Sequence, residues 1–253
     1  MITLPVLSAT DILLVLLSPA IGSFLALLCD RLPQGEDVIH TRSHCRSCQT
    51  PLRVFHMVPL LSYLALRGRC HHCNAAIPAL LPMIEAAAVF IALAVVMLAQ
   101  SDLQALLGAA YLWCLLALGV IDARYFRLPD PLTAALFLIG AGLAAVDPSR
   151  TLATALIAAL AASGAFLVLR FGYQMLRGRE GLGLGDVKLM AGLGAALGLE
   201  SLPLMVLIAA LCALLWAVLV AWRSGASLQG KTALPFGSFL CLAGGLVWIF
   251  RGY

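Results

Sequence analysis

Three aspartates stand at the ends of long apolar segments of the sequence, where an ionised group is costly. Asp186 opens one such segment within LGLGDVKLMAGLGAALG, residues 182–198. Asp122 closes another within VIDARYFRLPDPLT, residues 120–133, and Asp130 precedes the next one. Two carboxylates brought together at a membrane boundary cannot both ionise cheaply, so they share a proton and titrate jointly. One of them can then take a proton from water while the other protonates a carbonyl oxygen, which is the chemistry of an aspartic protease.

The same aspartates also fit structural roles. Aspartates at an interface often cap helices or pair with arginines, and Arg124 and Arg127 follow the first aspartate closely. For Asp130 a helix start is favoured, because Pro131 after it is a good first helical residue. For the other two aspartates, physical chemistry leaves capping and catalysis both open.

Three neighbours of Asp186 are predicted to support an active site: Gly183, Gly185 and Lys188. Glycine allows another backbone to approach closely, as a peptide substrate laid along the site would require. The glycines therefore favour catalysis over capping for this aspartate.

A second cluster of chemically capable residues lies in CRSCQTPLRVFHMVPLLSYLALRGRCHHC, residues 45–73. Its two CxxC pairs, Cys45/Cys48 and Cys70/Cys73, are separated by 21 residues. Four such thiolates surround Zn²⁺ tetrahedrally at about 2.3 Å and leave no open position, so the predicted metal site is structural. Metal binding would supply folding free energy to a segment that buries little apolar surface.

Two alternatives concern this cluster. Two disulfides are possible, but a cytoplasmic location is reducing and disfavours them. His44, His71 and His72 could replace a cysteine as ligand, although the four-cysteine set is complete without them. The remaining cysteines are scattered at or within apolar segments and are interpreted as packing residues: Cys29, Cys114, Cys212 and Cys241.

The apolar segments that must position these residues dominate the composition. The chain has 253 residues, of which 62% are hydrophobic and 11% charged, and its mean hydropathy is +1.02. This apolar composition excludes a soluble domain. The net charge of +4 does not indicate nucleic-acid binding, because the basic residues lie in short segments between apolar ones. Spanning about 30 Å of hydrocarbon takes about 20 helical residues. We therefore predict an all-α integral membrane protein with about eight transmembrane helices, at residues 10–29, 79–99, 104–121, 131–146, 151–171, 187–199, 203–222 and 234–250.

Basic residues set the predicted orientation. With the N-terminus outside, the loops and helix ends of one side carry all of the 16 Lys and Arg residues except Arg150 and Arg251. This predicts that both termini face outward and that the aspartates and the cysteine cluster face the cytoplasm. The first span lacks a basic segment before it and a small-residue cleavage site, so we interpret it as a retained helix. The chain then divides into a first transmembrane helix (1–29), a cytoplasmic zinc-ribbon-like loop (30–78) and a seven-helix membrane peptidase core (79–253).

Five segments together resemble one family, the type IV prepilin peptidases, which are membrane aspartic proteases of the GxGD class. The resemblance runs nearly end to end, through GSFLALLCDRLP (22–33), VPLLSYLALRGRC (58–70) between the CxxC pairs, IDARYFRLPDPLT (121–133), GLGLGDVKLMAGLGA (181–195) and PFGSFLCLAG (235–244).

The resemblance implies a function and a location. Asp122 and Asp186 would be the catalytic pair of an endopeptidase in the bacterial inner membrane. The substrate would be a prepilin or pseudopilin, whose basic leader is removed on the cytoplasmic side just after a glycine. Many members also N-methylate the new amine with S-adenosylmethionine, and Gly68 and Glu85 match positions retained in such members.

Some positions depart from the family pattern. Ala26 stands where the family usually has Asn. His56-Met57 replaces the usual pair of an acidic residue and Asn, and Leu80-Leu81 replaces the usual Arg-Tyr. Several polar groups that could position an amine or a cofactor are therefore missing, while both proteolytic motifs are intact. A peptidase without methyltransferase activity is accordingly the alternative to a bifunctional enzyme.

Other functions fit parts of the pattern. A zinc-stabilised scaffold without catalysis predicts that Asp122 and Asp186 lie far apart. A quinone-linked thiol oxidoreductase would place its CxxC pairs on the outer face, opposite to the charge bias. A zinc metalloprotease needs an open metal site and a base such as the glutamate of HExxH, and the sequence lacks that motif. An ion carrier would hold its acidic residues near the bilayer midplane, whereas these aspartates stand at the ends of apolar segments. An aspartic protease instead predicts that the two carboxylates approach each other.

Overall fold

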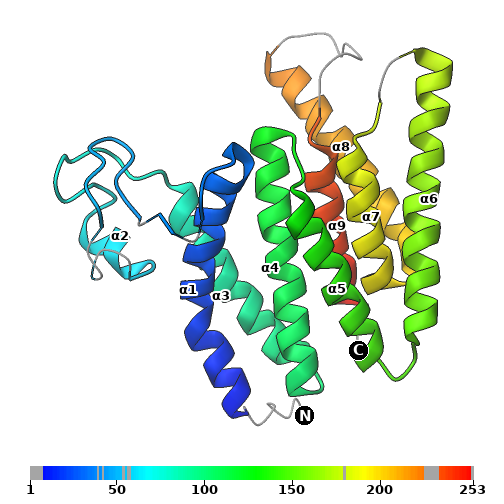
Figure 1. Ribbon diagram of the computed structural model, residues 1–253, viewed down its shortest axis with the longest axis horizontal. Coiled ribbons are helices and arrows are strands. Elements are labelled where there is room, and N and C mark those ends of the chain that lie inside the picture. Colours follow the sequence, from blue (N-terminus) through cyan, green and yellow to red (C-terminus); the bar gives the residue numbers. More distant parts are fainter. Residues whose placement is uncertain are drawn as a thin grey trace. The chain divides into compact units, whose positions relative to one another are not determined.

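The computed structural model describes residues 8–38, 40–41, 43–52, 55, 58–178, 181–224 and 234–251. Within these residues the regular secondary structure is helical apart from two isolated β-bridges, so the all-α prediction is confirmed. The helices, shown in Figure 1, are α1 (Ala9–Arg31), α2 (Leu61–Ala65), α3 (Leu80–Leu98), α4 (Asp102–Tyr125), α5 (Asp130–Val146), α6 (Leu152–Arg177), α7 (Leu184–Leu197), α8 (Leu202–Ser224) and α9 (Phe236–Phe250).

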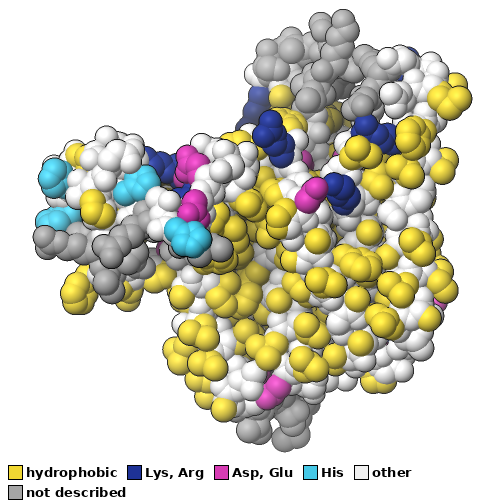
Figure 2. Space-filling model, in the orientation of Figure 1, with side chains coloured by type: hydrophobic (Ala, Val, Ile, Leu, Met, Phe, Trp, Pro, Cys, Tyr) yellow, Lys and Arg dark blue, Asp and Glu magenta, His cyan; other side chains and the backbone are white. Residues whose placement is uncertain are grey.

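Each of the eight predicted spans coincides with one of these helices. By length and hydropathy, α1, α3, α4, α6 and α8 are able to cross a membrane, whereas α5 and α9 are shorter apolar helices and α7 has only 14 residues. Hydrophobic side chains cover much of the face shown in Figure 2, and large apolar residues of α6 and α8 are exposed as expected of lipid contacts: Leu160, Val168, Leu214 and Trp216. The structure therefore supports a multi-pass membrane protein, while the count of eight crossings stays a prediction.

The chain forms two compact units, residues 1–109 and residues 110–253. In the first unit α1 packs along α3. A Cβ on Gly22 of α1 would lie 2.7 Å from the Cα of Glu85 and 2.9 Å from the Cβ of Ala88. A glycine is thus what allows the two helices to approach closely, as small residues do between membrane helices. The segment that joins these helices carries the four cysteines.

In the second unit α7 packs against both α5 and α6 and also contacts α9. Its glycines explain the close packing, because a Cβ on Gly192 would lie 2.8 Å from the side chain of Leu136 of α5. A Cβ on Gly194 would lie 2.6 Å from the carbonyl oxygen of Ala158 of α6. The glycine-rich sequence that weakens α7 as an isolated helix therefore lets it occupy the centre of this unit, where Leu193 is fully buried.

Two arginines bind the C-terminal end of α7. The guanidinium of Arg150 donates to the carbonyl oxygens of Ala196 at 2.5 Å and Ala195 at 2.7 Å. Arg251 donates to the carbonyl oxygen of Leu197. The last carbonyls of a helix have no partner within the helix, so these arginines satisfy acceptors that would otherwise be unpaired in an apolar setting.

Candidate active site

The structure brings Asp122 and Asp186 together within the second unit. Asp122 lies in the last turn of α4 and Asp186 in the first turn of α7, with 6% and 9% of their surfaces exposed. Gly237, in the first turn of α9, lies beside both. A Cβ on Gly237 would be 3.0 Å from Asp122 Oδ2 and 3.0 Å from Asp186 Oδ1, so the two oxygens are separated by no more than twice that distance. The expected approach of the two carboxylates is therefore found, and the distant placement expected of a scaffold is not.

Asp186 is held partly by its own helix. Gly183 is the N-cap of α7, and its N–H donates to Asp186 Oδ2 at 3.2 Å. A side chain at the third helical position that reaches back to the N-cap N–H is one half of a capping box. One carboxylate oxygen of Asp186 thus makes a capping contact while the other, Oδ1, faces Gly237. The capping contact of Asp186 therefore coexists with its approach to Asp122.

Asp122 is held by a different helix. Its Oδ2 accepts a hydrogen bond of 2.7 Å from the N–H of Ser238 and lies 3.0 Å from the Ser238 hydroxyl. Ser238 is the third residue of α9. Three helices therefore converge at the pair, since α4 and α7 supply the carboxylates and α9 supplies Gly237 and Ser238.

Asp130 lies outside this pair. It is the first residue of α5, which confirms the predicted helix start, and its carboxylate binds Lys188 Nζ at 2.6 Å on the surface. Lys188, predicted to support the active site, thus ties the start of α7 to the start of α5. Gly185, the second helical residue of α7, allows a similar approach, because a Cβ there would lie 3.0 Å from the Cβ of Leu128.

The two CxxC pairs form matching turns in the first unit. In the first turn the Cys45 N–H donates to Thr50 and its carbonyl accepts from Gln49. In the second turn Cys70 makes the corresponding bonds with Ala75 and Asn74. Gln49 and Asn74 both have a φ of +57°, so the two turns share one backbone conformation.

The four sulfurs of Cys45, Cys48, Cys70 and Cys73 lie within 4.8 Å of one another. The Cys45 and Cys73 sulfurs are 3.8 Å apart, which matches the edge of about 3.8 Å of a tetrahedron with metal–sulfur bonds of about 2.3 Å. All eight cysteines of the chain are free thiols, so the disulfide alternative is not adopted. The cluster therefore fits the predicted zinc ion.

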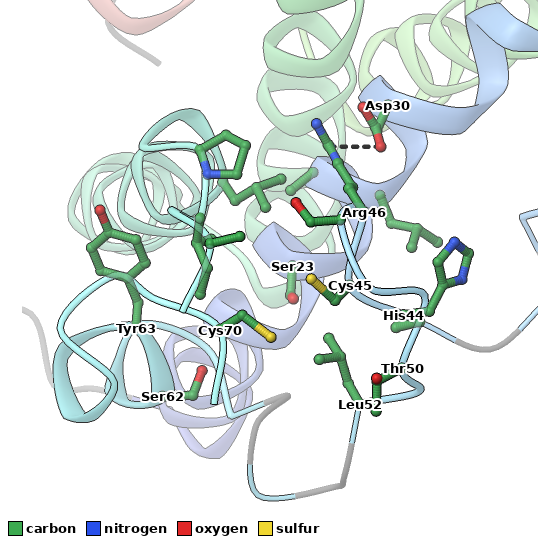
Figure 3. Close-up of a pocket in the computed structure, with 18 of the residues that line it drawn as sticks. Ser23, Asp30, His44, Cys45, Arg46, Thr50, Leu52, Ser62, Tyr63 and Cys70 are labelled. Atoms are coloured by element: carbon green, nitrogen blue, oxygen red, sulfur yellow. Dashed lines mark ion pairs between the residues drawn. The ribbon is translucent and has the colours of Figure 1, made fainter. Parts of the chain in front are cut away.

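Local hydrogen bonds favour the thiolate form at two of these cysteines. The side chain and the backbone of Thr50 lower the pKa of Cys48 to about 6. Hydrogen bonds from the backbone of Cys73 and His72 lower the pKa of Cys70. Thiolates are the metal-binding form of cysteine. His44, considered as an alternative ligand, points away from the sulfurs of Cys45 and Cys70 in Figure 3.

A cavity of about 1020 Å³ adjoins the cysteine cluster within the first unit, and Figure 3 shows part of its lining. An ion pair of 2.6 Å between Arg46 and Asp30 borders it. Glu85, on α3, also lines it, is 9% exposed and accepts a hydrogen bond of 2.8 Å from the Leu60 N–H. Glu85 thus holds the connecting segment against α3 at the cavity wall.

The other residues tied by resemblance to methylation are mostly near this cavity. Gly68 has a φ of +68°, and a Cβ there would lie 3.0 Å from the ring of Tyr63, which lines the cavity. Ala26 and Leu81 are lining residues as well. Leu80 is the first residue of α3, and Met57 lies outside the described residues.

Comparisons with known proteins agree with these features. The bacterial peptidase A24 N-terminal domain matches residues 16–99, and the type IV leader peptidase family matches residues 109–218. A prepilin leader peptidase/N-methyltransferase of Burkholderia pseudomallei is 39% identical over 223 residues, which are 88% of this chain and 71% of the relative. One of Aeromonas salmonicida is 33% identical over 264 residues, 93% of this chain and 90% of the relative. The chain belongs to the type IV leader peptidase family. No solved structure matches it.

Membership of the type IV leader peptidase family confirms the resemblance and the prediction of an enzyme. It also agrees with the apolar helices in supporting a multi-pass protein of the inner membrane. Sequence reasoning missed two residues beside the aspartates, Gly237 and Ser238, and one residue that binds the segment before α7, Arg170. Arg170 of α6 is buried and donates to the carbonyl oxygen of Leu182 in the segment before α7. An arginine within a predicted span, where a charged side chain is costly, was the signal that could have drawn attention to it.

Proposed function

We propose that the chain is a membrane-embedded aspartic endopeptidase that removes the basic leader from type IV prepilins or pseudopilins. Asp122 and Asp186 are its catalytic pair. The observation that carries the proposal is the position of the two carboxylates, which are buried and lie next to the same glycine in the first turn of α9. The basic residues of the adjoining loops support a cytoplasmic location for this site.

In the proposed reaction, one carboxylate is ionised and takes a proton from a water molecule as the water attacks the scissile carbonyl. The other carboxylate gives its proton to the carbonyl oxygen. Burial of the pair disfavours two simultaneous negative charges, which keeps one proton on it. Because a prepilin continues after its leader into a hydrophobic helix, the enzyme and its substrate would share the bilayer.

The test is cleavage of a prepilin in membranes that contain equal amounts of each variant, followed on a gel. Asp186→Asn and Asp122→Asn retain the side-chain shape but cannot exchange the proton, so each should lower the rate by several orders of magnitude. The double variant should be scarcely slower than either single one, because the two groups act as a unit. Asp130→Asn, the matched control at the same end of the helices, should process at a near wild-type rate. Normal cleavage by Asp186→Asn would refute the proposal.

We propose a structural role for zinc at the four cysteines. The ion would be held by Cys45, Cys48, Cys70 and Cys73, with its coordination shell closed and no part in proteolysis. It would fix the two matching turns relative to each other in a segment with few buried apolar side chains.

N-methylation of the new pilin amine is the second proposed activity. The observation that favours it is the cavity of about 1020 Å³ beside the cysteine cluster, which is at the upper end of the size of small-molecule sites. Its lining combines aromatic and carboxylate side chains, including Phe24, Tyr63 and Glu85, which fit the adenine and the positively charged sulfonium of S-adenosylmethionine. That cofactor would supply the methyl group. The names of the relatives support this activity, and the mass of mature pilin from cells that depend on this enzyme would test it.

A further inference from the structure

We infer that Ser238 is a positioning residue that keeps Asp122 as the ionised member of the pair, so that Asp122 is the base for water and Asp186 is the acid. This rests on the proposed function, because it assigns separate roles to two carboxylates already proposed to be catalytic. The assignment comes from the hydrogen bonds that each carboxylate accepts.

The two carboxylates differ in their donors. Asp122 Oδ2 has two donor groups of Ser238 within reach, the N–H at 2.7 Å and the hydroxyl at 3.0 Å. Asp186 Oδ2 accepts from the Gly183 N–H at 3.2 Å. Hydrogen bonds to a carboxylate favour its charged form, and short bonds favour it more than long ones. The shared proton therefore resides on Asp186.

The place of Ser238 in its helix explains the short bond to Asp122. Ser238 is the third residue of α9, so its N–H lies in the first turn, ahead of the regular hydrogen bonds of the helix. The N–H is 3.2 Å from the carbonyl oxygen of Pro235 and 2.7 Å from Asp122 Oδ2, so the carboxylate is the nearer acceptor. The dipole of a helix N-terminus favours negative charge on both aspartates, because Asp122 faces the start of α9 and Asp186 lies at the start of α7. The difference between the two carboxylates therefore comes from their hydrogen bonds.

The Ser238 hydroxyl is placed to follow the proton on Asp122. Its oxygen lies 2.9 Å from the carbonyl oxygen of Gly119 and 3.0 Å from Asp122 Oδ2, but it has a single proton to donate. When Asp122 is ionised, the hydroxyl donates to the carboxylate. When Asp122 has taken a proton from water, the hydroxyl turns to Gly119 and can accept from the protonated carboxyl. One hydroxyl thus satisfies both states of the base without moving the backbone.

The test is the pH dependence of prepilin cleavage by purified full-length enzyme. Ser238→Ala removes the hydroxyl and keeps the N–H. The acid limb of its kcat profile should move to higher pH by about one unit, since one hydrogen bond to a charged group is worth about that much. KM should be unchanged, and Ser238→Thr should restore the wild-type limb. The titratable groups that interact with Asp122 are Asp186 of α7 and Cys241 of α9, and both remain in these variants.

Ser163→Ala is the matched control, because it removes a hydroxyl that donates to the Ala159 carbonyl within α6. It should leave the acid limb in place. An unshifted limb in Ser238→Ala, or a limb that Ser238→Thr fails to restore, would overturn the inference while leaving the proposed protease intact, provided that Asp122→Asn is inactive. An active Asp122→Asn would instead overturn both. If Ser238→Ala is too unstable to purify, Ser238→Thr and wild type must still share one profile, and a difference between them would count against the inference.

Discussion

Gly237→Ala places one methyl group at the point where α9 meets the proposed catalytic pair. The added Cβ would lie 3.0 Å from Asp122 Cγ, Asp122 Oδ2 and Asp186 Oδ1. Ordinary contacts between carbon and other heavy atoms are longer, so the carboxylates and the helix must separate by a few tenths of an ångström. Both aspartates are attached to packed helices and buried, so neither can turn away into open space.

The substitution should lower activity without weakening the helix. Alanine favours a helix over glycine by about 1 kcal/mol, so α9 itself should not be weakened. Catalysis is sensitive to small displacements, and a misplacement of about 1 Å costs about a hundredfold in rate. A shift of a few tenths of an ångström should therefore lower kcat by about tenfold.

The assay is prepilin cleavage at saturating substrate, with thermal unfolding in the same detergent as the measure of stability. Gly172→Ala in α6 is the control, because a Cβ there has nothing within 4 Å, and it should leave the rate unchanged. A Gly237→Ala enzyme that cleaves at the wild-type rate would refute the placement of α9 against the two carboxylates. A loss of activity accompanied by a large fall in unfolding temperature would show that the methyl group disturbs the fold rather than the pair.

Three further outcomes are expected. Gently purified protein should contain one zinc ion per chain by elemental analysis, and Cys48→Ser should lower that content; metal-free protein with four reactive thiols would contradict the site. Glu85→Gln should leave prepilin cleavage intact but reduce N-methylation, so the measured mass of mature pilin should fall by one methyl group. Fully methylated pilin would show that Glu85 is dispensable for methylation. Arg150→Gln should reduce the free energy of unfolding by about 1–3 kcal/mol, because it removes the donors to the carbonyls of Ala195 and Ala196. An unchanged unfolding midpoint would mean that other groups satisfy those carbonyls.

Much of the fold could be predicted because lipid exposure imposes a simple pattern on the chain. All eight apolar segments are helices, and the cysteine pairs meet because their spacing encodes two similar turns. The approach of Asp122 to Asp186 was also expected, since both are ionisable groups at the ends of apolar segments. Each of these predictions depends on residue type and local spacing alone.

Contacts between distant segments could not be predicted in the same way. Ser238 and Asp122 are 116 positions apart, and a serine near the start of an apolar helix has many possible partners. The role of Gly185 was interpreted as space for a substrate, whereas in the structure Leu128 occupies that side of it. Lys188 was predicted to support the active site because it stands two residues after Asp186. A helix turns by about 100° per residue, so the two side chains leave α7 in different directions, and that of Lys188 reaches Asp130.

The length of α7 explains why an aspartate can stand where the apolar pattern begins. A helix of 14 residues is about 21 Å long, so it cannot cross about 30 Å of hydrocarbon by itself. Its two ends therefore need polar partners supplied by the protein. Arg150 and Arg251, the two basic residues on the predicted outer side, bind the carbonyls at its C-terminal end. At the N-terminal end, where negative charge is favoured, Asp186 caps the helix with one oxygen and faces α9 and Asp122 with the other. The short helix thus has arginines at one end and, at the other, a buried carboxylate beside Asp122, where the proposed cleavage of a membrane-anchored peptide would need it.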